Sequence, residues 1–352
     1  MLLSLNLKKH SYQIKVQRNS LAQSGAWIKT IWQKQKVALI TDSTVNQIYT
    51  QQVRESIEHN GFQTTVMAIP SGEASKSLEM AEFLYSKLAQ NHFTKSDGVV
   101  ALGGGVIGDL AGFVAATYMR GIHFLQIPTS LLAQVDSSIG GKTAVNTTAA
   151  KNLVGAFYQP DGVLIDPDVL DTLPQSRLKE GVAEIVKAAA IADVQLWQLL
   201  ESLKDINELK QRAEEVIIPA LKVKQQVVEE DEFDQNQRLI LNFGHTIGHA
   251  IEKTAGYGVI SHGESVAIGM VKMTQHAEKI GRTAKSTTQK LQQMLNKFDL
   301  PLTFADFNPI QIKEAIIHDK KVRDDQLKII LLEKIGQAKI VPVSLDTIEE
   351  YL

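Results

Sequence analysis

Cysteine is absent from all 352 residues of the sequence. Disulfide bonds, cysteine zinc sites and thiol nucleophiles are therefore excluded, and His, Asp and Glu remain as the plausible metal ligands. Long apolar runs are lacking as well, because none reaches the roughly 18 residues of a membrane-spanning helix. The opening MLLSLNLKKHSYQIKV has neither the apolar stretch nor the small-residue cleavage site of a signal peptide. We therefore expect a cytoplasmic protein without a membrane partner.

An excess of charge of either sign is also missing. The 37 Lys and Arg residues nearly balance the 39 Asp and Glu residues, and the formal net charge is -2 at pH 7. Such a chain has no overall field that would favour nucleic acid, so any anionic partner is expected to be small. The hydrophobic content of 44% is enough for substantial cores, and the length suggests two domains.

The pattern of helix and strand signals in the sequence changes near Pro174. Before it, short β-rich runs alternate with helical stretches, which predicts a parallel sheet with crossover helices. After it, helical spacing dominates, and KIILLEK at 328–334 fits either a late strand or a buried helix end. We expect an α/β domain over 1–174 and a mostly α-helical domain over 175–352. The expected strands are VALIT (37–41), TTVMAI (64–69), GVVAL (98–102), FLQIP (124–128) and GVLID (162–166).

A glycine-rich turn follows the third expected strand. Gly103, Gly105 and Gly108 have the spacing that lets a backbone approach a pyrophosphate at a helix N-terminus. Simple tight packing explains the same glycines equally well. The turn also departs from the usual dinucleotide-binding pattern, because it follows the third expected strand, whereas the first expected strand already ends in an acid, Asp42. That aspartate could bond an adenosine ribose or cap the following helix.

Polar side chains also follow two other expected strands. Glu73 and Lys76 stand in IPSGEASK after the second strand, and Thr129 and Ser130 follow the fourth. Because the carboxyl ends of parallel strands meet at one edge of a sheet, the sequence predicts a ligand crevice there.

The stretch LNFGHTIGHAIE, residues 241–252, places two histidines four residues apart. If one helix runs through it from residue 238, five polar side chains share an arc of roughly 80°. A solvated face is the ordinary explanation of such a stripe. This stripe has no lysine and is flanked by Gly244 and Gly248, which permit close approach of another element, so we favour a site. Its members are Arg238, Asn242, His245, His249 and Glu252.

Two further segments add candidates for this site. Glu184 and Lys187 lie three apart in an apolar stretch, which indicates a buried pair that needs partners, although an exposed ion pair is the alternative. His262 stands in a loop-like SHG, where a lone histidine is more often structural. Three ligands drawn from Glu184, His245, His249 and His262 would make an open zinc site with two histidines and one glutamate.

Scattered basic residues form a third group of candidates. Most lysines are merely solvated, but several that converged beside a metal would suit a substrate with a carboxylate and a phosphate. These residues are Arg120, Lys142, Lys151, Lys224 and Arg238.

Together these motifs resemble the 3-dehydroquinate synthase family of sugar phosphate cyclases, over nearly the whole chain. KNLVGAFYQP and the lysine-rich substrate residues also set the sequence apart from the polyol dehydrogenases of the same superfamily. The other segments that carry the resemblance are SGEASK, ALGGGVIGDLAGFVAATYMRGI, IPTSLLAQVDSSIGGKTAVN, KEGVAEIVKAA, LNFGHTIGHAIE, HGESVAIGM and HDKK.

The resemblance implies a lyase of the shikimate pathway, which leads to chorismate and the aromatic amino acids. Its substrate would be 3-deoxy-D-arabino-heptulosonate 7-phosphate, and its products 3-dehydroquinate and phosphate. The reaction would combine transient oxidation by NAD, phosphate β-elimination, re-reduction and aldol cyclisation. The family also implies a Rossmann-like NAD-binding domain, a helical metal-binding domain, an active site between them and a homodimer.

Residue roles follow from the same resemblance. It assigns zinc or cobalt to Glu184, His245 and His262, and a catalytic role without metal ligation to His249. Arg120 matches a phosphate-region residue donated across the dimer interface. The substrate-site residues would be Asp136, Lys142, Asn152, Lys187, Lys224, Arg238 and Asn242. The NAD contacts would be Asp42, Glu73, Lys76, Gly105, Val106, Ile107, Gly108, Asp109, Thr129, Ser130, Lys142 and Lys151.

The sequence departs from the family pattern at two positions. Asp234 stands where the family usually has Glu, and Asp325 replaces a usual glycine next to Lys320 and Lys321, either of which could face the site. The alternatives left open are a metal-dependent polyol dehydrogenase, a cyclase for glucose 6-phosphate or sedoheptulose 7-phosphate, and a nucleotide-binding regulatory protein with a degenerate site.

Overall fold

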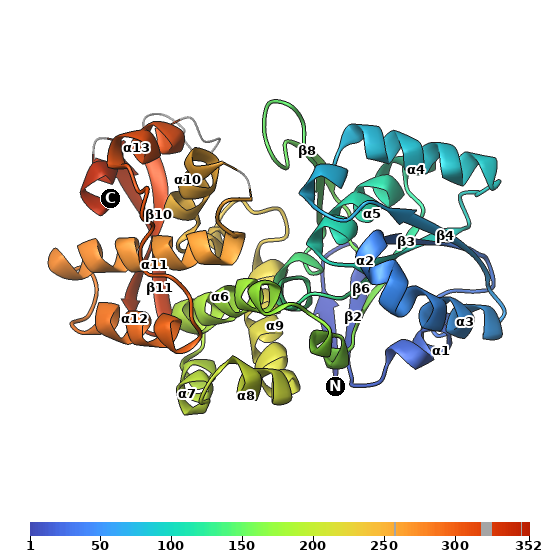
Figure 1. The fold of residues 1–352 in the computed structure, drawn as a ribbon, viewed down its shortest axis with the longest axis horizontal. Helices are drawn as coiled ribbons and strands as arrows, with labels where there is room; N and C mark the ends of the chain where they lie inside the picture. The colour runs from blue at the N-terminus through green and yellow to red at the C-terminus, as the bar shows by residue number, and fades with distance from the viewer. Residues whose placement is uncertain (257, 318–325, 346) are drawn as a thin grey trace. The chain divides into compact units, whose positions relative to one another are not determined.

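The chain divides into two compact units, Met1–Leu173 and Pro174–Leu352 (Figure 1). The computed structural model describes residues 1–256, 258–317, 326–345 and 347–352. Lys320, Lys321 and Asp325 lie outside the described residues. None of the helices in the described ranges is long and apolar enough to cross a membrane.

A seven-stranded sheet forms the centre of the first unit. Its strand order is β1-β2-β9-β6-β5-β3-β4, and only the β1–β2 pair is antiparallel. All five expected strands are confirmed, as β3 (Lys36–Asp42), β4 (Gln63–Ile69), β5 (Gly98–Gly103), β6 (His123–Pro128) and β9 (Gly162–Ile165). The edge hairpin of β1 (Leu2–Asn6) and β2 (Ser11–Val16) was not expected, although its side chains alternate between exposed and buried.

Helices cover both faces of this sheet, because successive side chains of a strand point to opposite sides. On one face, Val37 and Leu39 of β3 pack with α1 (Ser24–Lys29) and α3 (Gln51–His59). On the other face, Ala38 and Ile40 pack with α4 (Leu78–Gln90) and α5 (Gly105–Thr117). The unit also contains η1 (Leu21–Gln23), α2 (Ser43–Val45), η2 (Asn46–Thr50), η3 (Glu73–Ser75), η4 (Tyr118–Arg120), η5 (Ala133–Ser137), η6 (Pro167–Asp171) and the hairpin β7 (Lys142–Val145) and β8 (Val154–Phe157).

The sheet has a topological switch point between β3 and β5. The chain moves from β3 to β4 on one side and then returns to place β5 on the other side. Asp42 pairs with Ile69 and Gly103 pairs with Pro128, so the carboxyl ends of these strands lie at one edge. Open α/β sheets bind their ligands at such a point.

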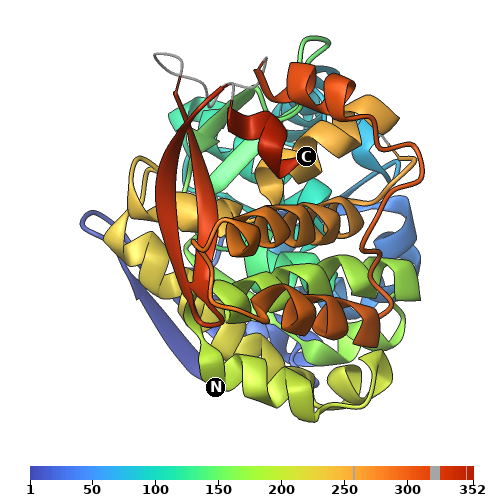
Figure 2. The same cartoon turned by 90° about the vertical axis from the view of Figure 1, so that its left-hand side faces the viewer.

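The second unit is mostly helical, as expected from the sequence. KIILLEK belongs to a strand, and the hairpin that contains it lies beside α6 and α11 (Figure 2). The helices are α6 (Gln175–Ala192), α7 (Val194–Ser202), α8 (Ile206–Gln211), α9 (Ala213–Glu230), η7 (Gln237–Asn242), α10 (His245–Ala255), α11 (His262–Lys279), α12 (Thr287–Lys297), α13 (Pro309–Ile317) and η8 (Thr347–Tyr351), and the hairpin consists of β10 (Gln326–Lys334) and β11 (Gln337–Ser344).

Helix α6 is the central element of this unit. It contacts α7, α9, α11 and both strands of the hairpin, and nearly all its side chains from Leu178 to Ile191 are buried. A helix that is covered on every side normally carries apolar residues throughout. The two charged side chains in its middle, Glu184 and Lys187, are therefore exceptions that need an explanation.

One continuous helix from Arg238 to Glu252 was the wrong expectation. Residues Gln237–Asn242 form a separate 3-10 helix, and α10 begins only at His245. The break is at Gly244, which has a left-handed φ of 79° and would, with a Cβ atom, clash with the carbonyl oxygen of Val266 at 2.6 Å. Arg238 and Asn242 therefore do not share the helical face of the histidines.

Glycines let the helices of the candidate site approach one another closely. A Cβ atom on Gly263 of α11 would lie 2.5 Å from the Cα of Glu180 in α6. A Cβ atom on Gly269 would collide with the carbonyl oxygen of Gly244. Small residues at these contacts bring the backbones of α6, α10 and α11 together.

We predict that Gly269→Ala destabilises the protein by about 1–3 kcal/mol, because the added methyl group has no space. Urea denaturation measures the free energy of unfolding, and Gln275→Ala, at an exposed position of the same helix, is the control. The control is expected to stay within about 0.5 kcal/mol of the wild type. Equal stability of Gly269→Ala and the wild type would contradict the close packing.

Candidate functional site

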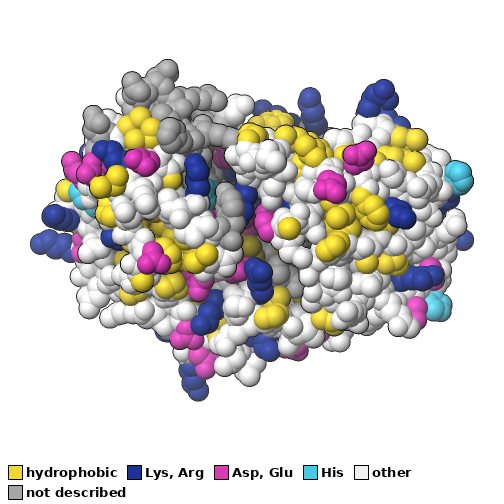
Figure 3. All heavy atoms as spheres, turned by 45° about the horizontal axis from the view of Figure 1, so that its top comes forward, with side chains coloured by type: hydrophobic (Ala, Val, Ile, Leu, Met, Phe, Trp, Pro, Cys, Tyr) yellow, Lys and Arg dark blue, Asp and Glu magenta, His cyan; other side chains and the backbone are white. Residues whose placement is uncertain are grey.

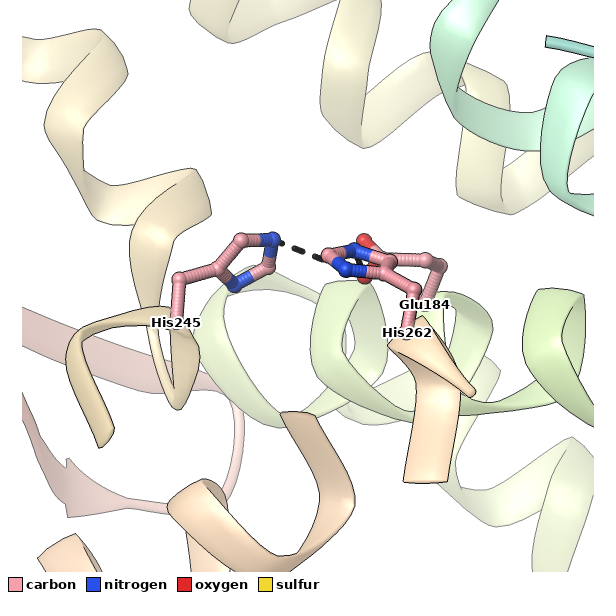
Figure 4. A group of neighbouring side chains, drawn as sticks. All are labelled: Glu184, His245 and His262. Atoms are coloured by element: carbon pink, nitrogen blue, oxygen red, sulfur yellow. Dashed lines mark ion pairs between the residues drawn. The ribbon is translucent and has the colours of Figure 1, made fainter. Parts of the chain in front are cut away.

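Three helices bring Glu184, His245 and His262 together. Glu184 lies in the middle of α6, whereas His245 and His262 are the first residues of α10 and α11. Their side chains point toward one another (Figure 4). Oε1 of Glu184 is 3.7 Å from Nε2 of His245 and 3.5 Å from Nε2 of His262. The structure thus gathers three of the four candidate ligands around one point.

Local structure fixes both histidines at their positions. Nδ1 of His245 lies 3.1 Å from the carbonyl oxygen of Phe243, and because a carbonyl only accepts, Nδ1 carries the proton and Nε2 the lone pair. His262 lies within a capping box, in which Ser261 and Glu264 bond each other's side chains and backbone. The SHG segment is therefore a helix start rather than a loop.

The three side chains fit a divalent metal ion. Zinc bonds of about 2.0–2.1 Å in tetrahedral geometry place two ligand atoms roughly 3.3 Å apart, close to the separations from Glu184. Both carboxylate oxygens of Glu184 are buried without a hydrogen-bond partner in the structure. A buried carboxylate without hydrogen bonds needs positive charge beside it. Two imidazoles and one carboxylate would leave a coordination position open for a substrate or water.

Lys187 supplies one positive charge to this carboxylate. Its ammonium pairs with Oε2 of Glu184, and both side chains are at least 96% buried, so the alternative of an exposed ion pair is wrong. Burial alone would raise the pKa of Glu184, but Lys187 and His262 together lower it to about 2. The carboxylate is therefore ionised at neutral pH and available as a metal ligand.

His262 has carboxylates at both ring nitrogens. Nε2 faces Glu184, and Nδ1 lies 3.1 Å from Oε2 of Glu252. Burial alone would lower the pKa of His262, but these two neighbouring carboxylates raise it to about 10. Without a metal ion, the ring is therefore protonated at neutral pH.

His249 lies beside the three ligand candidates. Its ring centroid is 5.2 Å from that of His245 and 5.8 Å from that of His262. Ligand atoms of His249, Glu252 and His262 also lie within 4.8 Å of one another. Four-residue spacing on α10 thus places His249 next to the candidate metal position, on the same helical face as His245 and Glu252.

Buried cationic side chains come from neighbouring elements of the same unit. Lys224 of α9 is 7% exposed and Arg238 of η7 is 2% exposed. Arg238 is held by a bond from Nη1 to the carbonyl oxygen of Glu232 and by one from its backbone N–H to Asp231. Asn242 ends η7 and is half-buried, and Asp234 has a left-handed φ of 58°. On the surface, by contrast, Lys and Arg stand among Asp and Glu without forming one basic stripe on the face drawn in Figure 3.

The first unit collects the nucleotide-site candidates at the switch point. Lys76 is buried and pairs with Asp109 of α5, and Oε1 of Glu73 accepts a bond of 2.8 Å from Asn146. The backbone N–H of Thr129 donates to the carbonyl oxygen of Gly103, which joins the ends of β5 and β6. Ser130 follows directly in the chain. These residues form the edge that the sequence analysis predicted.

Close packing accounts for one glycine of the glycine-rich turn, and its role in binding a pyrophosphate stays a prediction. A Cβ atom on Gly108 would lie 2.7 Å from Oε1 of Gln126, so Gly108 serves close packing of α5 on the sheet. Gly104 is the N-cap of α5, and it brings no side-chain cap to the first N–H groups of Gly105, Val106 and Ile107. This helix start is available to an anion.

Asp42 has the capping role that the sequence analysis left open. Its Oδ1 accepts bonds of 2.8 Å and 3.1 Å from the backbone N–H groups of Thr44 and Val45. The ribose contact implied by the family is a separate prediction for this residue.

Other candidates of the first unit lie in turns and in the β7–β8 hairpin. Arg120 and Asn152 have left-handed φ values of 64° and 51°, which non-glycine residues seldom adopt. Asp136 lies in η5, Lys142 begins β7, and Lys151 precedes β8. The candidate substrate residues are thus divided between the two units.

Comparisons with known proteins agree over the whole chain. A family profile described as 3-dehydroquinate synthase N-terminal matches residues 66–180, and the C-terminal profile of the same family matches residues 181–322. The 3-dehydroquinate synthase of Enterococcus faecalis (strain ATCC 700802 / V583) is 58% identical, with 100% of this chain and 98% of the relative covered. That of Streptococcus suis (strain 05ZYH33) is 52% identical, with 100% and 99% covered.

The chain belongs to the 3-dehydroquinate synthase family. Solved structures of related cyclases have the same fold as this family member. A 2-deoxy-scyllo-inosose synthase complexed with carbaglucose-6-phosphate, NAD+ and Co2+ has a TM-score of 0.90 at 27% identity, covering 99% of this chain and 98% of the other. ValA, a 2-epi-5-epi-valiolone synthase from Streptomyces hygroscopicus subsp. jinggangensis with NAD+ and Zn2+ bound, has a TM-score of 0.89 at 27% identity, covering 98% and 97%.

One residue of this family member received no role from the sequence. Glu252 was part of the polar stripe, but only the structure shows its carboxylate against His262. Its position three residues after His249 and seven after His245 was the available signal.

Metal binding is predicted to release about one proton at pH 8, because the His262 ring must lose the proton that its raised pKa retains in the metal-free protein. Calorimetric titration with zinc in two buffers of different ionisation enthalpy counts the protons. A histidine of ordinary pKa, about 6.5, would already be neutral at pH 8. Binding without proton release at that pH would contradict the paired carboxylates.

Proposed function

We propose that this chain converts 3-deoxy-D-arabino-heptulosonate 7-phosphate to 3-dehydroquinate and phosphate, as a phosphate-eliminating lyase of the shikimate pathway. Family membership at 58% identity over the full length supports this reaction. The observation that carries the proposal within the structure is the buried cluster of Glu184, His245 and His262, whose chemistry fits a metal ion. A cytoplasmic location and a homodimer that shares Arg120 across its interface remain predictions from the resemblance.

Glu184, His245 and His262 would hold zinc or cobalt. The donor set of one carboxylate and two imidazoles suits either ion, and related cyclases contain Co2+ or Zn2+. When bound, the ion would lower the pKa of a coordinated substrate hydroxyl. Glu184 is already ionised, and the carbonyl oxygen of Phe243 holds the proton of the His245 ring on Nδ1, so Nε2 is the nitrogen left for the ion.

NAD would bind at the switch point of the first unit, with its pyrophosphate at the start of α5. The cyclases that share this fold at 27% identity contain NAD+. Bound there, NAD would supply a hydride acceptor that is regenerated within each turnover. The contacts we propose are Asp42, Glu73, Lys76, Gly105, Val106, Ile107, Gly108, Asp109, Thr129, Ser130, Lys142 and Lys151.

Buried cations would hold the anionic groups of the substrate. Lys187, Lys224 and Arg238 are each at most 7% exposed, and a cation kept out of water binds a carboxylate or phosphate more strongly than a solvated one. Fixing the substrate in one pose contributes several kcal/mol in well-oriented reactions, about 7–11 in the best cases. The other proposed substrate residues are Arg120, Asp136, Lys142, Asn152 and Asn242.

His249 would move a proton at the substrate hydroxyl that is oxidised. It lies one helical turn after His245 and is partly exposed, so its ring can reach a substrate beside the metal ligands. Positioned histidines contribute about 10²–10⁴-fold to rates as general acids or bases. A histidine that binds the metal could not accept this proton, because its lone pair is already bonded to the ion.

The rival dehydrogenase function has weaker support. The glycerol dehydrogenase of Schizosaccharomyces pombe shares the fold at 14% identity with a TM-score of 0.62. At that identity only the fold is comparable, whereas the curated relatives at 58% and 52% identity are 3-dehydroquinate synthases.

The reaction itself gives the first test. With the heptulosonate phosphate, zinc and NAD at a tenth of the substrate concentration, phosphate and 3-dehydroquinate are expected in equal amounts that exceed the NAD supplied. Glucose 6-phosphate and sedoheptulose 7-phosphate are the controls and should yield no phosphate. NADH that accumulates without phosphate release would instead identify a dehydrogenase.

The division of roles between the two histidines of α10 gives a second test. His249→Ala is expected to retain one metal ion per chain and to lose turnover by about 100-fold or more. His245→Ala should lose the ion, and His59→Ala, at an exposed histidine of the first unit, should change neither property. Metal content after dialysis and initial rates are measured together. If His245→Ala and His249→Ala were equally free of metal, the division into one ligand and one catalytic histidine would be wrong.

A further inference from the structure

We propose that Glu252 is a positioning residue for the metal site, whose carboxylate holds His262 in the tautomer and orientation that direct Nε2 at Glu184 and His245. The inference rests on the proposed metal binding and adds a residue that lies outside the ligand group. Glu252 would touch neither the substrate nor the ion.

The contact itself defines the tautomer. Oε2 of Glu252 lies 3.1 Å from Nδ1 of His262, and the glutamate side chain is 13% exposed. An ionised carboxylate only accepts hydrogen bonds, so Nδ1 is the donor. In the neutral ring the lone pair is then on Nε2, which is the atom that faces Glu184 at 3.5 Å. The other tautomer would direct N–H, rather than a lone pair, at the metal position.

The backbone around His262 does not fix the ring by itself. Gly256 and Gly258 in the preceding connection have φ values of 88° and 94°, and they contribute no side chain that could pack on the imidazole. Ser261 and Glu264 fix the first turn of α11 through their capping box. The cap therefore positions the backbone of His262, and Glu252 positions its side chain.

Helix α10 reaches the ligand of the next helix through this contact. Glu252 lies seven residues after His245, so both are on one face of α10, and α10 packs closely on α11. A single rigid helix thus carries one metal ligand and also holds a second. His245 differs, because its Nδ1 bonds the carbonyl oxygen of Phe243. A carboxylate partner makes an imidazole more basic than a neutral carbonyl does.

A role for Glu252 as a direct ligand is the competing explanation. His249, Glu252 and His262 could also surround an ion. Nδ1 of His262 cannot donate to Glu252 and coordinate an ion at the same time. The distance of 3.1 Å is that of a hydrogen bond, whereas the distances of 3.5 Å and 3.7 Å from Glu184 leave room for an ion. The geometry favours one ion, held by the Glu184 group.

Metal affinity without substrate tests the proposal. We expect Glu252→Ala to bind zinc about 10- to 100-fold more weakly than the wild type, as for other partners of metal-bound histidines. Glu252→Gln should lie between the two, because its amide oxygen still accepts from Nδ1. Glu229→Gln removes the same charge from an exposed position of α9 and should bind like the wild type. Competition with a chromophoric chelator gives the dissociation constants.

The metal-free unfolding midpoint and the stoichiometry complete the experiment. A stability loss shared by all Glu252 variants, with unchanged zinc affinity per folded chain, would overturn the proposal. Two ions in the wild type and one in Glu252→Ala would also overturn it, by making Glu252 a ligand. A wild type that binds one ion with the expected Glu252 effect but forms no 3-dehydroquinate would refute the proposed function and leave the positioning role intact.

Discussion

The second unit depends on how one buried negative charge is neutralised. Glu184 stands in the middle of a helix that is covered on nearly every side, and its carboxylate has ion pairs but no hydrogen bonds. Ionisation in such a place costs several kcal/mol unless positive charge lies close by. The Lys187 ammonium pairs with this carboxylate, and two imidazoles leave space for a metal ion. A buried carboxylate, which would destabilise an ordinary core, can therefore serve here as a metal ligand.

The packing of the helices places the groups that neutralise this charge. Two ligands are the first residues of their helices, so small changes in the positions of α10 and α11 would separate them. Gly263 and Gly269 allow backbone contacts that larger residues would prevent. The capping box around His262 fixes the backbone, and the carboxylate of Glu252 orients the ring. The two glycines, the capping box and Glu252 thus all help to hold the metal-binding side chains in place.

Periodic signals in the sequence predicted the regular parts of this protein. The five predicted strands and the buried Glu184 and Lys187 pair follow from local patterns, because each depends on neighbours within a few residues. The break at Gly244 could not be recognised, since glycine is tolerated in helices and only the approach of α11 requires the left-handed backbone there. The partner of His262 was also hidden, because a contact between two helices has no local periodicity. In the nucleotide site, the positions of polar residues after the strands predicted a ligand crevice, and the individual NAD contacts came from the family resemblance.

The central claim is that Glu184, His245 and His262 hold one divalent ion and that His249 stays free of it. X-ray absorption spectroscopy of the zinc-loaded protein measures the ligands directly. The account predicts one zinc ion with two imidazole nitrogens and carboxylate or water oxygens at about 2.0–2.1 Å. His249→Ala should leave this spectrum unchanged. Three imidazoles in the wild type, reduced to two in His249→Ala, would contradict the account.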